Sequence, residues 1–187
     1  MVKKNTCVFI SGTGSNLINL IRRSRDNNFP INIKLIITNN KDANGIIYAK
    51  RNSIPYLIIN TKLRYYEAHL LKILKRKKIT LICLAGYMKI ISDNFIKKYG
   101  KKIINIHPSL LPKFKGLNTF ERVLKNMERK TGCTVHHVNK KLDDGQIIAK
   151  RSFFINPSDN EKSLKKKTQI LEHKVFPEAI IKIFRYN

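Results

Sequence analysis

The sequence predicts an α/β fold: a single-domain, Rossmann-like open sheet that is mostly parallel and ends in an antiparallel strand pair and a long C-terminal helix. Two observations support this prediction. Through the first half of the chain, short apolar segments alternate with longer amphipathic segments, which is the pattern of right-handed β-α-β units. After Leu117 the alternation stops, and two strand-like segments joined by a polar turn precede one long amphipathic segment.

Five strands are predicted in the first part of the chain, because five segments are short and almost continuously apolar. They are Thr6–Ile10, Ile31–Thr38, Tyr56–Ile59, Leu81–Ala85 and Ile103–Ile106. Apolar residues at helical spacing predict the helices between them. These are Leu17–Arg23, Ala43–Asn52, Arg64–Lys77 and a helix that Asp93 can cap and that runs through Tyr99.

The second part of the chain predicts a different arrangement. A helix is expected over Thr119–Lys130. Strands over Gly132–Val138 and Gln146–Ile155 follow, and the short connection through Lys140–Gly145 predicts that they pair in an antiparallel manner.

The last helix is expected over Glu161–Phe184, with Ser158 or Asp159 as its cap. Pro177 lies inside it and predicts a kink or a break. Because no internal repeat, low-complexity tract or linker is found, we expect one domain over residues 1–187.

Composition favours a soluble cytoplasmic protein. At 187 residues and 42% hydrophobic content, the chain can bury a core without a disulfide or a metal. Cys7, Cys83 and Cys133 lack metal-ligand spacing, so reduced thiols are expected. The first apolar run is too short for a signal peptide, and no apolar stretch approaches the ~20 residues that span a bilayer.

The net charge of +26, from 38 Lys and Arg against 12 Asp and Glu, is the strongest compositional signal. The lysines are scattered, whereas nucleic-acid binders concentrate them on one face or element. Ile and Asn share AT-rich codons with Lys and are also frequent, so base composition accounts for much of the excess. We expect small anionic substrates, no specific nucleic acid and no membrane, with polyanion binding as the alternative.

A glycine-rich loop, Ser11–Asn16, lies between the first predicted strand and helix. Glycine permits a tight turn, and a helix N-terminus presents free N–H groups to an anion. The loop lacks the third glycine of the dinucleotide-binding motif and the lysine of the P-loop. A phosphate site and an ordinary capped turn are therefore about equally supported.

Asn105 and His107 are separated by one residue at the end of a predicted strand, so their side chains point to the same side. An amide donor and an imidazole suit acyl transfer, in which an oxyanion is stabilised and a proton moves. Pro108 and Pro112 stiffen the segment behind them. A single histidine at a strand end is usually structural, but this combination favours a catalytic role.

Asp143 lies in the predicted turn between the last two strands. A carboxylate beside His107 would favour the imidazolium and orient the ring. However, Asp-Asp-Gly is also a common hairpin turn, and spacing does not decide between these interpretations.

Several motifs resemble one family, the formyl-folate-dependent formyltransferases, and within it the phosphoribosylglycinamide formyltransferases of purine synthesis. The matching segments, in the correct order over nearly the whole chain, are Ser11–Leu17, Ala85–Ile91, Ile104–Gly116, Gly132–Gly145, and Glu172-His173 with Phe176-Pro177. The resemblance implies a phosphate-binding half over about 1–100 and a folate-binding and catalytic half over about 101–187.

The resemblance implies transfer of the formyl group of 10-formyltetrahydrofolate to the amine of glycinamide ribonucleotide, without a metal. Asn105 and protonated His107 would stabilise the tetrahedral oxyanion, and Asp143 would sustain the protonated imidazole and assist proton movement. The residues implied in substrate binding are Gly14, Ser15 and Asn16 for the phosphate and Glu172 near the ammonium. Those implied in folate binding are Arg64, Met88, Lys89, Ile90, Ile91 and Asn105.

Three positions depart from the family pattern. Asp144 replaces the first glycine of Asp-Gly-Gly, Asn118 stands where some relatives have histidine, and Lys89 replaces a frequent arginine. None of them removes a member of the predicted trio.

Three alternatives are less well supported. Methionyl-tRNA formyltransferase shares the Asn-x-His-Pro-Ser core, but that family carries an additional C-terminal domain, which we do not expect here, and its N-terminal loop lacks the Gly-Ser-Asn phosphate signature. Formyltetrahydrofolate hydrolase usually carries a regulatory domain before the catalytic part. A non-catalytic nucleic-acid-binding protein is disfavoured because no binding motif or interleaving of basic and aromatic residues is found. A monomer and a homodimer are equally compatible with the sequence.

Overall fold

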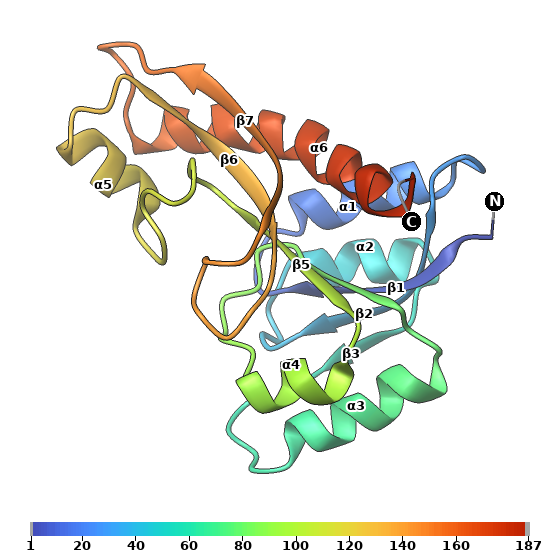
Figure 1. Ribbon diagram of the computed structural model, residues 1–187. Helices are drawn as coiled ribbons and strands as arrows, with labels where there is room; N and C mark the ends of the chain where they lie inside the picture. Colours follow the sequence, from blue (N-terminus) through green and yellow to red (C-terminus); the bar gives the residue numbers. More distant parts are fainter. Residues whose placement is uncertain (1, 186–187) are drawn as a thin grey trace. The chain divides into compact units, whose positions relative to one another are not determined.

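The computed structural model describes residues 2–185 (Figure 1). Within that range, none of the helices has the length and apolar character needed to cross a membrane. The strand order is β3-β2-β1-β4-β5-β6-β7, which confirms the predicted α/β class. The chain divides into two compact units, Met1–Ile104 and Asn105–Asn187, and β5 (Lys102–His107) begins in the first and ends in the second. A single domain over 1–187 stays a prediction.

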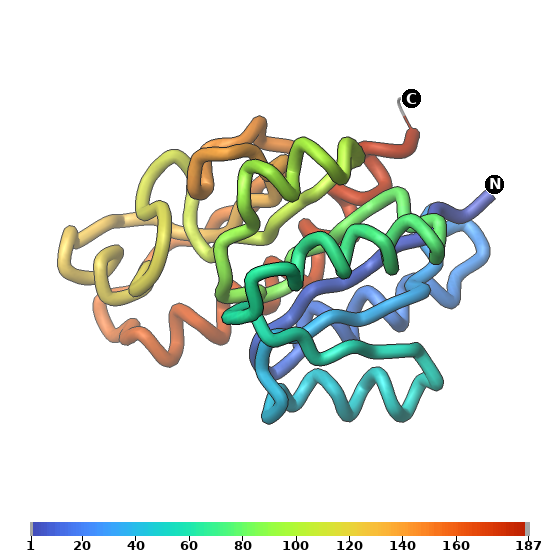
Figure 2. Tube along the Cα trace, turned by 90° about the horizontal axis from the view of Figure 1, so that it is seen from below, coloured from blue at the N-terminus to red at the C-terminus, as the bar shows by residue number. Residues whose placement is uncertain are grey.

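The first unit alternates strand and helix as predicted. Its elements are β1 (Lys4–Ile10), α1 (Ser15–Ser24), β2 (Ile31–Thr38), α2 (Gly45–Arg51), β3 (Tyr56–Ile58), α3 (Tyr66–Arg76), β4 (Leu81–Leu84) and α4 (Asp93–Tyr99). β1 pairs in parallel with both β2 and β4, and β2 pairs in parallel with β3. Helices α1 and α2 pack together, as do α3 and α4, and the two pairs cover opposite faces of these strands (Figures 1 and 2).

Burial on both faces explains why the strands of this unit are apolar without alternation. All four residues of β4 are buried, and so is β1 from Thr6 to Ile10. Parallel strands covered by helices on both faces have this pattern. Helix α1 contributes Leu17, Leu20 and Ile21, which share one face at a spacing of three and four residues.

The cap of α4 differs from the prediction. Ser92 is the N-cap, since its Oγ accepts the N–H of Phe95 at 3.0 Å, and Asp93 lies in the first turn. There Asp93 forms an i,i+4 ion pair with Lys97. Serine and aspartate both cap helices, and the prediction chose the aspartate one residue too late.

The second unit is built around an antiparallel pair. Its elements after β5 are α5 (Thr119–Lys125), β6 (Lys130–His137), β7 (Ile147–Phe154) and α6 (Glu161–Arg185). β6 and β7 pair in an antiparallel manner, as predicted, and α6 packs against both strands (Figure 1). Leu164, Val175, Phe176 and Ile180 are among the α6 residues buried in this core.

Two helix predictions in this unit are wrong in detail. Helix α5 ends at Lys125 because Met127 adopts a left-handed conformation (φ 49°), and Lys130 already belongs to β6. The cap of α6 is Asn160, not Ser158 or Asp159.

A reciprocal pair of hydrogen bonds defines this cap. Asn160 Oδ1 accepts the N–H of Ser163, and Ser163 Oγ accepts the N–H of Asn160, both at 3.0 Å. The helix continues past Pro177 to Arg185, so Pro177 does not split it, and the alternative of a kink stays a prediction.

Candidate active site

The three predicted catalytic residues come together in the second unit. Asn105 and His107 lie on β5, and Asp143 lies in the turn between β6 and β7. The Asp143 Oδ2 atom is 3.2 Å from His107 Nδ1, and Asn105 Nδ2 donates to Asp143 Oδ1 at 3.3 Å. Asp143 therefore lies next to His107, which the spacing of these residues in the sequence could not decide.

The local backbone explains why Asp143 faces inward. Its φ of 48° is left-handed, a conformation that Asp tolerates better than most residues. Its side chain is buried, and the N–H of Gly116 donates to Oδ2 at 2.9 Å. The turn closes tightly at Gly145, where a Cβ atom would lie 1.7 Å from the carbonyl oxygen of His137, so only glycine fits.

Both ring nitrogens of His107 face hydrogen-bond acceptors. Nδ1 faces Asp143, and Nε2 is 2.9 Å from the carbonyl oxygen of Phe114. Burial lowers the pKa of His107, while Asp143 and the Phe114 carbonyl raise it, and the net shift is downward. The free imidazole therefore resists protonation, but two acceptors are in place to hold the imidazolium once it forms.

Asp143 is ionised in this environment. Burial raises its pKa, but the Gly116 N–H and His107 are among the groups that lower the pKa below the usual value of 3.8. The carboxylate thus supplies a permanent negative charge beside two imidazoles.

His136 is the member of this cluster that sequence reasoning missed. It lies on β6 with 2% of its surface exposed, and its Nε2 is 3.2 Å from Asn105 Nδ2 and 3.5 Å from Asp143 Oδ1. Its Nδ1 is 2.8 Å from the carbonyl oxygen of His137. The one signal was a histidine doublet shortly before the Asp-Asp-Gly turn.

Asp144 occupies a different environment from its neighbour Asp143. It is exposed and forms an ion pair with Lys115, whose hydrogen bond lowers the pKa of Asp144. Asn118, another departure from the family pattern, is the left-handed N-cap of α5 and is exposed.

The predicted phosphate loop lies in the first unit, between β1 and α1. Gly14 is the N-cap of α1 with φ 75°, and no side chain caps this helix. A Cβ on Gly14 would lie 2.6 Å from Gly45 Cα, so glycine is required by both the left-handed backbone and the close approach. Ser15 and Asn16 begin the helix, whose N-terminal N–H groups suit an anion.

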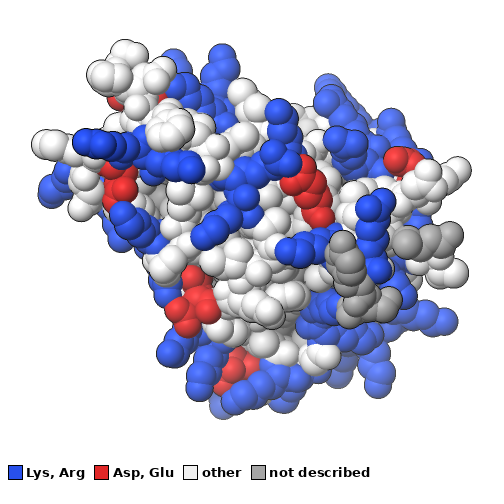
Figure 3. All heavy atoms as spheres, turned by 45° about the horizontal axis from the view of Figure 1, so that its top comes forward, with Lys and Arg blue, Asp and Glu red and all other residues white. Residues whose placement is uncertain are grey.

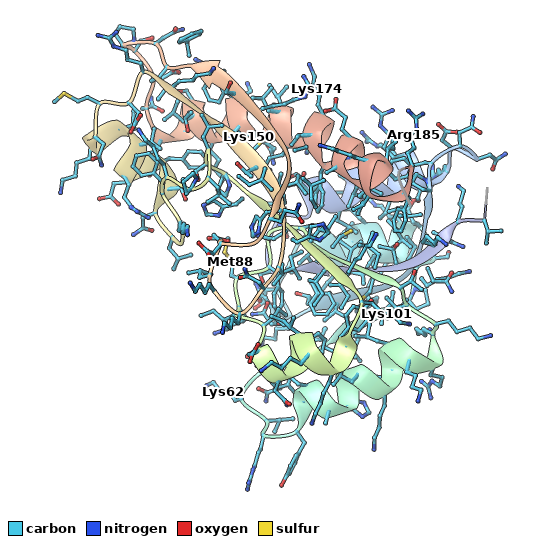
Figure 4. The ribbon with its side chains drawn as sticks, viewed as in Figure 1. Lys62, Met88, Lys101, Lys150, Lys174 and Arg185 are labelled. Carbon is cyan, nitrogen blue, oxygen red and sulfur yellow. The ribbon has the colours of Figure 1, made fainter. Side chains whose placement is uncertain are left out.

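The segment predicted to bind folate adjoins this loop. The N–H of Ser11 donates to the carbonyl oxygen of Gly86 at 3.1 Å, and the N–H of Met88 donates to Ser11 Oγ at 2.8 Å. The strand order reverses between β1 and β4, and open α/β sheets bind ligands at such a switch point. The Met88 side chain is largely exposed in the loop after β4 (Figure 4).

The other predicted binding residues lie at separate positions. Lys89 and Ile90 are exposed and Ile91 is half-buried, all in the loop after β4. Arg64 precedes α3 and lies 5.4 Å from the centroid of the Tyr65 ring. In the second unit, Glu172 is half-buried on α6, and its charge adds to the effect of burial, which raises the pKa of Cys133 to about 12.

Among residues 2–185, no group of three or more His, Cys, Asp and Glu side chains could hold a metal ion.

The family follows from a direct comparison. Residues 4–180 match the family model described as formyl transferase. The chain belongs to the formyl transferase family. The structure agrees: it superposes on phosphoribosylglycinamide formyltransferase from Bacillus halodurans with a TM-score of 0.92 and 33% identity, covering 96% of this chain and 95% of that one. For the Campylobacter jejuni enzyme of the same name the TM-score is 0.90 at 34% identity, with 98% of each chain covered.

Curated relatives in this family include much longer proteins. The chain is 40% identical over 182 residues to the human trifunctional purine biosynthetic protein adenosine-3. That match covers 95% of this chain and 18% of the human protein, so the chain spans about a fifth of its length.

Proposed function

We propose that this chain is a phosphoribosylglycinamide formyltransferase, which transfers the formyl group of 10-formyltetrahydrofolate to the amine of glycinamide ribonucleotide. The observation that carries the proposal is the buried cluster in which Asp143 contacts both Asn105 and His107. An amide, an imidazole and a carboxylate in contact provide the three groups that acyl transfer needs: an oxyanion donor, a proton carrier and a charge that stabilises the carrier.

In the proposed reaction, the substrate amine attacks the formyl carbon, and a C–N bond forms as the carbonyl electrons move to oxygen. The C–N10 bond to the folate then breaks, and one proton passes from the amine to N10. An N–H of Asn105 stabilises the oxyanion. His107 carries the proton, and as an imidazolium it stabilises the same oxyanion, with Asp143 holding its charge at 3.2 Å.

The downward pKa shift of His107 fits this role. A neutral imidazole can accept the proton that the amine releases, and the resulting imidazolium keeps the Asp143 carboxylate as the acceptor at Nδ1. To reach the oxyanion, Nε2 exchanges the Phe114 carbonyl for the substrate oxygen. Asp143 stays ionised because its own pKa is lowered.

The substrates have anionic ends, and the chain offers complementary groups. Gly14, Ser15 and Asn16 bind the phosphate through main-chain N–H groups at the α1 N-terminus, whose N-cap residue Gly14 makes no side-chain cap bond. Glu172 contacts the substrate near its ammonium. Lys and Arg side chains also cover much of the face drawn in Figure 3, which favours the approach of anionic small molecules.

The folate end is assigned to the loop after β4. Met88, Lys89, Ile90 and Ile91 line the pterin pocket with main-chain groups and apolar side chains, and Arg64 lies near the folate tail. We further propose a cytoplasmic location, a monomer or homodimer, and no specific nucleic-acid partner.

A direct assay tests the proposal. Purified protein is mixed with glycinamide ribonucleotide and 10-formyltetrahydrofolate, and the change in folate absorbance is followed. His107→Ala should lower kcat by several orders of magnitude, since each of its two roles is typically worth about 10²–10³-fold. No turnover by folded wild-type protein contradicts the function, and an unchanged rate in His107→Ala contradicts the role.

Asp143→Asn and Asp144→Asn form a matched pair for the carboxylate. The first removes the charge beside the imidazoles, and the second removes an exposed charge paired with Lys115. Asp143→Asn should therefore lower kcat far more. The reverse ranking would mean that the wrong carboxylate is assigned.

A further inference from the structure

The buried ring of His136 has no part in the reaction proposed above, yet it touches two members of the catalytic trio. It lies 3.2 Å from Asn105 Nδ2 and 3.5 Å from Asp143 Oδ1. The register of the β6–β7 pair shifts between Val135 and His136. Such irregularities re-aim side chains next to functional sites.

The partner of Nδ1 determines the tautomer of the ring. Nδ1 is 2.8 Å from the carbonyl oxygen of His137, which can only accept a hydrogen bond. A neutral ring therefore carries its hydrogen on Nδ1. A hydrogen on Nε2 could donate to Asp143 Oδ1, but only across 3.5 Å, and it would leave the Nδ1 lone pair facing the carbonyl oxygen at 2.8 Å. In the Nδ1–H tautomer, Nε2 is an acceptor, and it faces the Asn105 amide.

The distances then constrain the amide. Asn105 Nδ2, His136 Nε2 and Asp143 Oδ1 are separated by 3.2, 3.3 and 3.5 Å, so they form a nearly equilateral triangle. The angle at Nδ2 is thus roughly 60°, whereas the two N–H bonds of an amide diverge by about 120°. One N–H points between His136 and Asp143, and the other points away from both.

We propose that His136 is a positioning residue that holds the Asn105 amide with its nitrogen toward the cluster, so that the second N–H is presented to the oxyanion. Because Nε2 of His136 is an acceptor, it favours the amide nitrogen of Asn105, rather than the amide oxygen, at the position that faces it. If the amide turned over, the oxygen would face the oxyanion and repel it. The inference rests on the proposed function, since it concerns the orientation of a group in that reaction.

A double-mutant cycle tests the action through Asn105. His136→Leu removes the acceptor and should lower kcat about 10²-fold, the scale of one lost oxyanion donor, with each KM within about threefold. In an Asn105→Ala background, the same change should cost almost nothing further. His136→Gln, which can place an amide oxygen near the Nε2 position, should restore part of the rate. His69→Leu, at an exposed position on α3, is the control and should match the wild type.

A second measurement does not depend on activity. Long-range ¹H–¹⁵N correlation of the wild-type protein reports which ring nitrogen of His136 carries the hydrogen in the neutral ring, with His136→Gln used for assignment. A hydrogen on Nδ1 supports the inference. A hydrogen on Nε2 overturns it, as does an additive loss in the double mutant. A wild-type protein without turnover would contradict the proposed function alone, because the tautomer is still decided by the spectrum.

Discussion

Among the glycines of the proposed phosphate loop and its surroundings, Gly14 is the one at which an added methyl group should destabilise the structure most. Its φ of 75° is left-handed, which costs a non-glycine residue about 1–2 kcal/mol. The added Cβ would also lie 2.6 Å from Gly45 Cα, whereas carbon atoms normally approach to about 3.5–4.0 Å. A shift of about 1 Å in the main chain is therefore needed.

Gly45 cannot easily make that shift. Its N–H donates to the carbonyl oxygen of Gly12 at 3.1 Å, and a Cβ built on Gly45 itself would lie 2.4 Å from Ile10 Cδ1. Overpacking of this kind typically costs about 1–3 kcal/mol. Together with the backbone cost, Gly14→Ala should lower the free energy of unfolding by about 2–5 kcal/mol.

Two other glycines separate the cost of the left-handed backbone from the cost of the contact with Gly45. Gly86 has φ 78° but nothing within 4 Å of its Cβ position, so Gly86→Ala should cost only the backbone term of about 1–2 kcal/mol. Gly12 has neither a left-handed φ nor a neighbour within 4 Å, so Gly12→Ala should stay within about 0.5 kcal/mol of the wild type.

Urea denaturation of the three variants measures this ranking, and the KM for the proposed substrate, glycinamide ribonucleotide, measures the proposed phosphate site. We expect Gly14→Ala to show the largest loss of stability and a raised KM. Equal losses for Gly14→Ala and Gly86→Ala would refute the argument from the Gly45 contact. A Gly14→Ala variant as stable as the wild type would refute both contributions.

Further predictions concern a cap, an ion pair and a buried imidazole. Ser92→Ala removes the cap of α4 and should lower the unfolding free energy by about 1 kcal/mol in urea. Lys115→Met should raise the pKa of Asp144 toward its usual value, measured by ¹³C NMR titration; an unchanged pKa would contradict the assigned cause. Because the folded-state pKa of His107 lies below 6.5, the unfolded chain takes up its proton first, so stability should fall as the pH drops below about 6.5. His107→Gln should reduce that fall, and an identical pH dependence would contradict it.

The strands of the first unit could be predicted because burial on both faces makes their residues almost continuously apolar. The range Ile31–Thr38 was predicted with both ends correct, and Leu81–Ala85 exceeded β4 by one residue. Helix ends were harder. Ser158, Asp159 and Asn160 are adjacent and can all cap, and only the path of the backbone selects Asn160.

The candidate site was predictable in part for a similar reason. Asn105 and His107 share one strand, so alternation alone places them on one side. Their distance to Asp143 depends on how β6 and β7 pair, which local pattern does not specify. The histidine doublet was only a weak signal for His136, because β6 is buried from Thr131 to His136 and a histidine in such a strand resembles any core residue.

The Asp143–Asp144 pair shows how the fold separates two residues that the sequence presents as equivalent. A left-handed φ turns Asp143 inward, where the Gly116 N–H and two imidazoles meet its carboxylate. Asp144 turns outward to Lys115, and that ion pair offsets a charge that would otherwise oppose the ionisation of its neighbour. The departure from Asp-Gly-Gly therefore adds a surface ion pair and leaves Asp143 as the carboxylate that faces His107 and His136.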